Sequence, residues 1–188
     1  FLLKHGNACS KTMSNNEPFI VNITGEDIAN EDRLASIFSA RWNCTMKKED
    51  TMHPIDFSCW RTGEPKTIID EDGLQKVLNP KMELKAWAET RVRDHKFGDF
   101  PTIYLALKKF MFAKDIVNNF GKPCFFIVEW TGCGSIGFAD LSQVDATADD
   151  FLHYQNVNYR NQKRDIGTVV EISLDDFNLV EHGYNGLS

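Results

Sequence analysis

The chain has 188 residues, of which 42% are hydrophobic and 26% charged, so we expect one soluble domain with a single apolar core. Its formal net charge of −6 excludes a protein that holds nucleic acid over a uniformly basic surface. No apolar run approaches the roughly 20 residues that span a bilayer, and FLLKHGNACSKT lacks the apolar run of a signal peptide, so we expect an intracellular, cytoplasmic protein without a membrane partner.

The first part of the chain predicts an arm. Residues 1–26 are expected to form this N-terminal arm, with one short strand at PFIVNIT (18–24). Met13 is expected to be the natural initiator, so that residues 1–12 are upstream or cloning-derived sequence. A single domain is expected over residues 27–188.

An amphipathic helix is predicted over residues 30–42. Asn30 offers an N-cap, and the acidic Glu31 and Asp32 follow in the first turn, where the helix dipole favours them. Apolar residues recur at helical spacing: Leu34, Ile37, Phe38 and Trp42.

The middle of the chain predicts strands and turns. MKKED (46–50) is expected to be a charged loop, and HPIDFSCW (53–60) a strand with Pro54 at its start. TIIDEDGLQKVLNPK (67–81) carries a turn cluster at 70–73 and is predicted to be a hairpin insertion. MELKAWAETRVR (82–93) predicts a strand, with Ala86 and Ala88 on one face and Trp87 and Glu89 on the other. DHKFGDFP (94–101) is expected to be a loop.

The last part of the chain predicts a second helix and further strands. The helix is expected over 105–120 and ends at Gly121 and Pro123. Its apolar face is expected to carry Phe110, Met111, Ala113, Val117 and Phe120. CFFIVEW (124–130) and SIGFADL (135–141) predict a hairpin. Residues 143–167 show no clear periodicity. TVVEISLDDFNLV (168–180) predicts a strand and a short closing segment. The order indicates an α/β or α+β fold, with one mixed sheet flanked by helices.

Five cysteines, an odd number with no CxxC motif, indicate free thiols in a reducing compartment. They are Cys9, Cys44, Cys59, Cys124 and Cys133. Cys124 and Cys133 could face each other across a hairpin, but a zinc site needs more ligands at closer spacing.

Two acids stand within predicted strands, Asp56 in PIDF and Glu89 in KAWAETRVR. Burying a carboxylate is unfavourable unless it is paired or binds a cation. Two carboxylates on adjacent strands can hold one Mg²⁺, and a basic side chain two residues after the second acid lies on the same strand face. Arg91 occupies that position, beside a site for metal-dependent phosphodiester hydrolysis.

Pro54-Ile55-Asp56 followed by Glu89-Thr90-Arg91 resembles the signature of the PD-(D/E)xK nuclease superfamily. The helix EDRLASIFSARW, the run AWAETRVRDHKFGDFPTIYLALKKF and the hairpin GKPCFFIVEW–SIGFADL resemble a phage or mobile-element subgroup, over about residues 31–141 and more faintly through RNQKRDIGTVVEISLDDF. The resemblance implies a restriction-endonuclease-like core. It also implies a viral protein that cleaves DNA in the cytoplasm of the host cell. DNA is the implied partner, with a homodimer or a larger viral or recombination complex as further possibilities.

By this resemblance Asp56 and Glu89 would ligate Mg²⁺ or Mn²⁺, with the Thr90 carbonyl as a third ligand and Glu31 as a weaker candidate. Arg91 departs from the family, which has a catalytic lysine there. An arginine stays protonated, so it keeps a positive charge near phosphate but cannot act as a base. Two candidates could supply the lysine: Lys109, at the start of the next helix, and Lys85, which is in phase with Glu89.

Basic residues concentrate around this motif. Residues 85–114 carry seven Lys or Arg against three acidic residues, a balance of +4 within a chain of net charge −6. The residues expected to touch DNA are Arg91, Arg93, Lys96, Lys108 and Lys109. Such a local patch predicts modest, salt-sensitive affinity.

Two alternatives stay open at this stage. Arg91 and the acidic net charge favour a catalytically degenerate relative that serves as a viral DNA-binding, structural or partner-binding protein. An unrelated α+β binding domain would instead keep Asp56 and Glu89 apart, in separate ion pairs. His53 and His95 flank the expected site and are expected to face solvent.

Overall fold

A computed structural model of the chain describes residues 25–50, 53–146, 151–158 and 163–180. For residues 152–158 and 163–167 it describes the backbone alone. The strand predicted at 18–24 and the initiator expected at Met13 lie outside the described residues. Within the described chain, neither helix is long and apolar enough to cross a membrane.

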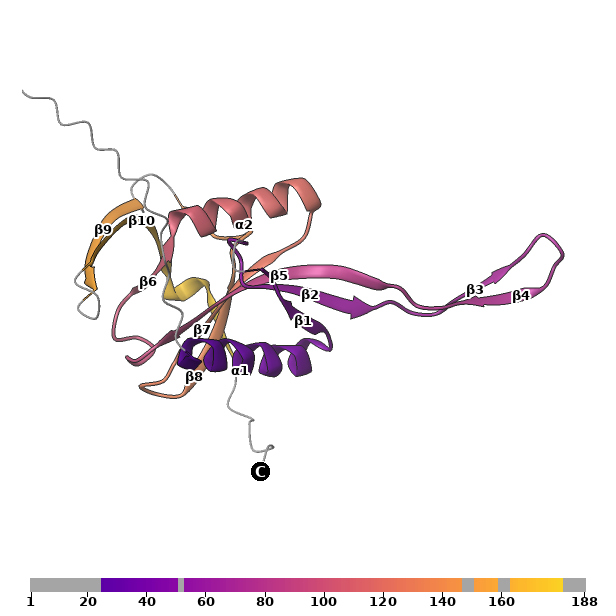
Figure 1. The fold of residues 1–188 in the computed structure, drawn as a ribbon, viewed down its shortest axis with the longest axis horizontal. Helices are drawn as coiled ribbons and strands as arrows, with labels where there is room; N and C mark the ends of the chain where they lie inside the picture. Colours follow the sequence, from indigo (N-terminus) through magenta and orange to yellow (C-terminus); the bar gives the residue numbers. More distant parts are fainter. Residues whose placement is uncertain (1–24, 51–52, 147–150, 159–162, 181–188) are drawn as a thin grey trace, which may run out of the picture.

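A six-stranded mixed sheet forms the centre of the molecule (Figure 1). Its order is β1 (Thr45–Lys48), β2 (Phe57–Thr62), β5 (Met82–Arg93), β7 (Cys124–Trp130), β8 (Ser135–Asp140) and β11 (Phe177–Val180). Neighbouring strands are antiparallel, except that β5 and β7 are parallel. The predicted α+β class with a mixed sheet is confirmed.

Helices cover the two faces of this sheet (Figure 1). On one face α1 (Gly25–Trp42) buries Leu34 and Phe38 against Ala86 and Ala88 of β5. On the other face lies α2 (Leu107–Phe120), which buries Phe110, Ala113 and Ile116. A second sheet, β6 (Thr102–Ala106), β10 (Lys163–Ser173) and β9 (Phe151–Asn158), packs on the α2 side, and a short 3-10 helix (Leu174–Asp176) leads into β11.

The strand β5 has the bounds that the sequence predicts, and its alternation is confirmed. Ala86 and Ala88 join the core beneath α1, whereas Trp87 packs against the core beneath α2. The predicted hairpin insertion is also present, as β3 (Lys66–Ile69) and β4 (Gln75–Leu78). It extends away from the body of the molecule (Figure 1).

Several predicted boundaries are wrong. The helix expected at 30–42 already begins at Gly25, and the charged loop expected at 46–50 forms β1 through residue 48. The strand expected at 53–60 is β2 at 57–62, and the helix expected at 105–120 begins at Leu107, because residues 102–106 pair with β10. Residues 151–158 and 163–167, which show no clear periodicity, form the β9–β10 hairpin.

The predicted apolar face of α2 is partly wrong. Phe110 and Ala113 are buried as expected, but Met111 and Phe120 are exposed, and Ile116 is buried in their place. The predicted end of the helix is confirmed: Gly121 adopts a left-handed conformation with φ of 59°, and its N–H donates to the Val117 carbonyl.

Candidate active site

Two carboxylates lie where the pairing between β2 and β5 ends. The last pair of that ladder joins Phe57 to Ala88, and Asp56 and Glu89 are the next residues beyond it on the two strands. Glu89 is fully buried, and the Asp56 side chain is 16% exposed. Strand register therefore places the two acids side by side at the edge of the core.

The carboxylate of Asp56 is held in place by Thr90. Its Oδ2 accepts hydrogen bonds from the Thr90 backbone N–H at 2.9 Å and from the Thr90 hydroxyl at 3.0 Å. The N–H and C=O of one strand residue point to the same strand edge. The Thr90 carbonyl, the third ligand implied by the family resemblance, therefore faces the side of β5 on which Asp56 lies.

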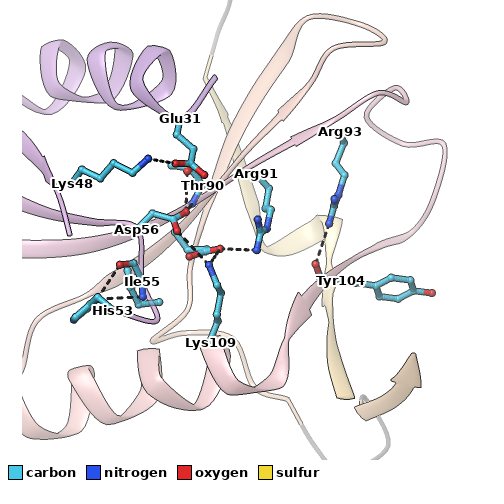
Figure 2. Close-up of polar contacts among 11 residues, drawn as sticks. Glu31, Lys48, His53, Ile55, Asp56, Thr90, Arg91, Arg93, Tyr104 and Lys109 are labelled. Carbon is cyan, nitrogen blue, oxygen red and sulfur yellow. Dashed lines mark hydrogen bonds and ion pairs between the residues drawn. The ribbon is translucent and has the colours of Figure 1, made fainter. Parts of the chain in front are cut away.

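Lys109 joins the two carboxylates. It lies in the first turn of α2 and extends towards the sheet (Figure 2). Its Nζ donates to Glu89 Oε1 at 2.5 Å and to Asp56 Oδ1 at 3.3 Å. Asp56 and Glu89 therefore converge on one ammonium group, which excludes the alternative in which the two acids are kept apart in separate ion pairs.

Arg91 adds a second positive charge beside Glu89. Its Nη2 lies 3.2 Å from Glu89 Oε1, and its side chain is 38% exposed. Arg91 and Glu89 share one face of β5, and the guanidinium group lies beside the buried acid (Figure 2) while part of the Arg91 side chain is open to solvent. It is therefore placed to contact an anion that approaches the site from outside.

The two acids have pKa values shifted in opposite directions. Burial and the nearby negative charge of Asp56 raise the pKa of Glu89 from 4.5 to about 7, although Arg91 and Lys109 oppose this. Burial also acts to raise the pKa of Asp56, but the Lys109 charge and the hydrogen bonds from Thr90 outweigh it, so that pKa falls below its usual value. An acid pair with separated pKa values is typical of functional sites.

The donor set fits a hard divalent cation. Glu89 Oε2 is buried and has no hydrogen-bond partner among the described residues, so it keeps an oxygen available for a further ligand. No third His, Cys, Asp or Glu joins the pair within the described part of the chain. Two carboxylates and a carbonyl suit Mg²⁺ or Mn²⁺, which retain several waters as ligands.

Glu31, the weaker candidate ligand, pairs with a lysine. The Lys48 ammonium of β1 donates to the Glu31 carboxylate (Figure 2). Burial acts to lower the pKa of Lys48, but the negative charges of Glu31, Asp32 and Asp56 outweigh it and raise that pKa above its usual value. Metal ligation by Glu31 stays a prediction, and it would require this ion pair to open.

Lys85 does not reach the acid pair. The ladder between β2 and β5 shifts register between Cys59 and Trp60, which pair with Ala86 and Leu84, so Lys85 is skipped at a β-bulge. Its ammonium pairs with Glu83 at 2.5 Å. A bulge disrupts the two-residue alternation that made Lys85 appear in phase with Glu89.

The remaining basic residues lie around the site rather than in it. Arg93 donates to the Tyr104 carbonyl at 3.4 Å, at the same end of β5 (Figure 2). Lys96 is exposed in the loop that follows β5, and Lys108 is exposed in the first turn of α2. Contact of these residues with DNA stays a prediction.

Two features of the site are absent from the sequence predictions. Lys48 was assigned to a solvated loop, and its position beside Asp56 follows from the β1–β2 pairing of Lys48 with Phe57, which TMKK does not signal. His53 does not simply face solvent: its ring stacks on Trp87 at 5.0 Å, and its Nδ1 lies 2.9 Å from the Ile55 carbonyl oxygen. His53 therefore fixes the turn that precedes Asp56.

The four described cysteines, at positions 44, 59, 124 and 133, are free as predicted.

The fold and the site together define a class: an α+β domain of the restriction-endonuclease-like kind, with an acid pair at the edge of a mixed sheet. The sequence profile of a family described as "Phage putative PDDEXK endonuclease" matches residues 22–180. The chain belongs to this family. No curated protein and no solved structure matches the chain.

Proposed function

We propose that the chain is a metal-dependent deoxyribonuclease whose active site is built by Asp56, Glu89 and Lys109. The observation that carries this proposal is the position of the Lys109 Nζ, within 3.3 Å of both carboxylates. The family to which the chain belongs supports nuclease chemistry, and the site offers the groups that this chemistry needs.

Asp56 and Glu89 would hold the cation, Mg²⁺ or Mn²⁺, with the Thr90 carbonyl as a third ligand. A divalent cation bound there supplies a Lewis acid and makes water more acidic near neutral pH. The hydrogen bonds from Thr90 keep Asp56 ionised and oriented. Burial of Glu89 keeps bulk water away from the inner side of the site.

Lys109 replaces the lysine that the family has at position 91. It approaches the acid pair from α2 rather than from β5, and its Nζ donates to both carboxylates. Lys109 would contact a non-bridging oxygen of the scissile phosphate, with Arg91 beside it on the solvent side.

The N-terminal position of Lys109 in α2 also favours the binding of an anion. It carries Lys108 and Lys109 and no acidic residue, and the cap residue Ala106 offers no side-chain hydrogen bond. Cations at a helix N-terminus oppose the helix dipole, so this arrangement does not serve helix stability. Free N–H groups and two lysines at one helix end suit a phosphate.

DNA would lie across the end of β5 and the start of α2. Arg93, Lys96 and Lys108 would contact backbone phosphates there, and these contacts supply affinity without sequence preference. Assembly into a larger phage complex is compatible with this placement, because the hairpin of β3 and β4 extends from another part of the molecule (Figure 1).

Cleavage of linear, nicked and branched DNA in the presence of Mg²⁺ or Mn²⁺ tests the proposal. We expect wild-type protein to cut at least one substrate, chelator to stop the reaction, and Glu89→Gln to abolish it. Glu83→Gln, on the same strand but exposed and outside the site, serves as the matched control and should retain full activity. Absence of cleavage of every substrate, or equal cleavage by Glu89→Gln, would reject the proposal.

A catalytically degenerate DNA-binding or structural protein is the second candidate. Arg91 in the lysine position favours it, as does the neutralisation of Glu89 by two cations of the chain itself. Calorimetric titration with Mn²⁺ separates the two candidates. Binding that Asp56→Ala removes favours the enzyme, and no binding at millimolar Mn²⁺ favours the degenerate protein.

A further inference from the structure

The hairpin of residues 63–81, named here the projecting hairpin, exposes several large apolar side chains to solvent. Every residue of β3 and β4 is exposed. Large apolar side chains are exposed along its length: Ile68, Ile69, Leu74, Val77 and Leu78. Ile68 and Ile69 are consecutive residues of β3, so their side chains lie on opposite faces of the hairpin. An isolated two-stranded hairpin is marginally stable in water, so another surface is needed to cover it.

The tip of the projecting hairpin has a defined shape and charge. Asp70 closes the turn, since its Oδ1 accepts from the N–H groups of Asp72 at 3.1 Å and Leu74 at 2.8 Å. Glu71 and Asp72 are left exposed between two apolar side chains, Ile69 at 70% and Leu74 at 66% exposure. The acidic tip disfavours DNA as the covering surface, because phosphates would repel it.

A pocket of about 460 Å³ lies at the base of the same hairpin and is named here the basal pocket. It is apolar and basic, and so complements the apolar and acidic tip of the hairpin. Its apolar part includes Trp42 and Phe125, whose ring centroids lie 4.8 Å apart. Three cations also line it: Arg41, Arg61 and Lys85. Arg41 has no hydrogen bond or ion pair with the described residues, so its charge is available to a partner.

We propose that the covering surface is a second copy of this chain, and that the tip of each projecting hairpin docks in the basal pocket of the other copy. Ile69 and Leu74 would enter the apolar part of the pocket, while Glu71 and Asp72 meet Arg41 and its neighbouring cations. The hairpin cannot reach its own pocket, because it extends away from its own base (Figure 1).

The position of the pocket allows the two copies to make the same tip-to-pocket contact. Arg61 and Lys85 lie on β2 and β5, at the base from which the hairpin extends. About ten residues separate this base from the tip, which corresponds to roughly 30 Å of strand. Two hairpins that lie antiparallel across a two-fold axis therefore bring each tip to the other base, and both contacts form at once.

Sedimentation velocity of the whole chain tests the oligomeric state. The proposal predicts a dimer that Ile69→Asp or Arg41→Glu weakens by about tenfold or more, and that Arg41→Glu combined with Glu71→Arg restores. Leu179→Asp, an exposed apolar residue outside both surfaces, is the control and should leave the dimer unchanged. Circular dichroism checks that the variants fold, as expected for residues with exposed side chains.

Disulfide cross-linking tests the contact itself. Cys44 is a free thiol that lines the basal pocket, so Asp72→Cys should form an intermolecular disulfide with Cys44 under diamide, identified by peptide mapping. Adding Cys44→Ser should remove the product, and Asp115→Cys, on the exposed side of α2, should not form it.

Two results would overturn the proposal. The first is a monomer at every concentration, and a DNA affinity that falls with Ile69→Asp would then assign the hairpin to DNA. The second is a dimer without the cross-link from Asp72→Cys. Neither result depends on whether the protein cleaves DNA.

Discussion

Glu89 is a fully buried carboxylate that lies beside a second acid, and such a residue destabilises a fold unless it is compensated. Lys109 and Arg91 supply part of that compensation. The raised pKa, about 7, shows that the compensation is incomplete when no metal is bound. Burial is the main cause of the raised pKa, so a divalent cation that binds both carboxylates would favour the ionised form of Glu89.

The effect of Glu89 on stability should depend on pH. Its proton is held more tightly in the folded protein, with a pKa of about 7, than at the ordinary value of 4.5 that applies to the unfolded chain. The free energy of unfolding contributed by this residue therefore falls as pH rises from about 4.5 to 7. Glu89→Gln removes this loss, so the variant should exceed wild type by on the order of 3 kcal/mol at pH 8 in chelator.

Urea unfolding of both proteins from pH 4 to pH 8 measures this difference. The gap between the variant and wild type should be small at pH 4 and should open between pH 5 and pH 7. A gap that does not change with pH would show that Glu89 is not the titrating group.

Lys109 and Lys108 are adjacent lysines that should behave differently. Lys109 contacts both carboxylates, whereas Lys108 is exposed. Lys109→Ala should lower kcat for DNA cleavage by about 10²- to 10³-fold, the usual effect of losing one transition-state donor. Lys108→Ala should leave kcat unchanged and weaken DNA binding slightly, with a smaller salt dependence. Equal losses of kcat in the two variants would contradict the role given to Lys109.

At the residue scale the sequence locates the acid pair but not everything around it. Asp56 and Glu89 are predictable because an acid within an apolar strand is conspicuous, and the alternation of β5 assigns Glu89 a face. Lys85 illustrates the limit of this reasoning, since a bulge removes it from that face. Lys48 comes near Asp56 only through pairing between strands, which depends on residues distant in sequence.

At the scale of elements, the parallel pair β5 and β7 and the connection through α2 build the site. The connection places the first turn of α2 against the end of β5, which brings Lys109 to Glu89. The turn after β7 supports the same end, because Thr131 donates to the Arg93 carbonyl at 2.8 Å and Gly132 to the His95 carbonyl at 3.2 Å.

Gly132 should be intolerant of any side chain. A Cβ at this position would lie 2.6 Å from the His95 carbonyl carbon, which is backbone and cannot rotate away. Gly132→Ala should therefore destabilise the protein by roughly 1–3 kcal/mol and shift the end of β5. Thermal unfolding measures the loss. Gly25→Ala, whose Cβ would meet nothing within 4 Å, is the control, and an equal effect of both would contradict this packing.

Elements with strong local signals are predictable, and elements that depend on partners are not. β5 and β7 have their predicted bounds because turns flank continuous apolar or alternating runs. β6 lies immediately before α2, and its residues 105–106 fit a helical pattern until β10 pairs with them. β9 is polar, so only its pairing with β10 defines it as a strand.

At the scale of the whole molecule, acidic and basic regions are separated. The net charge of −6 coexists with a basic segment at residues 85–114 that contains the site. The acidic tip of the projecting hairpin lies far from the body of the molecule (Figure 1). The charge balance predicts local contact with phosphates from the sequence alone, but the extent of the hairpin and its exposed apolar surface become evident only in the structure.

The central claim is that Asp56 and Glu89 jointly bind a divalent cation and that Lys109 acts beside it. Calorimetric titration with Mn²⁺ at pH 8 of wild type, Asp56→Asn and Lys109→Met tests this most directly. Wild type should bind one ion, and Asp56→Asn should lose most of that affinity. Lys109→Met should bind more tightly, because a positive charge near both carboxylates is gone, and yet fail to cleave DNA. No binding by wild type, or unchanged affinity in Asp56→Asn, would contradict the account.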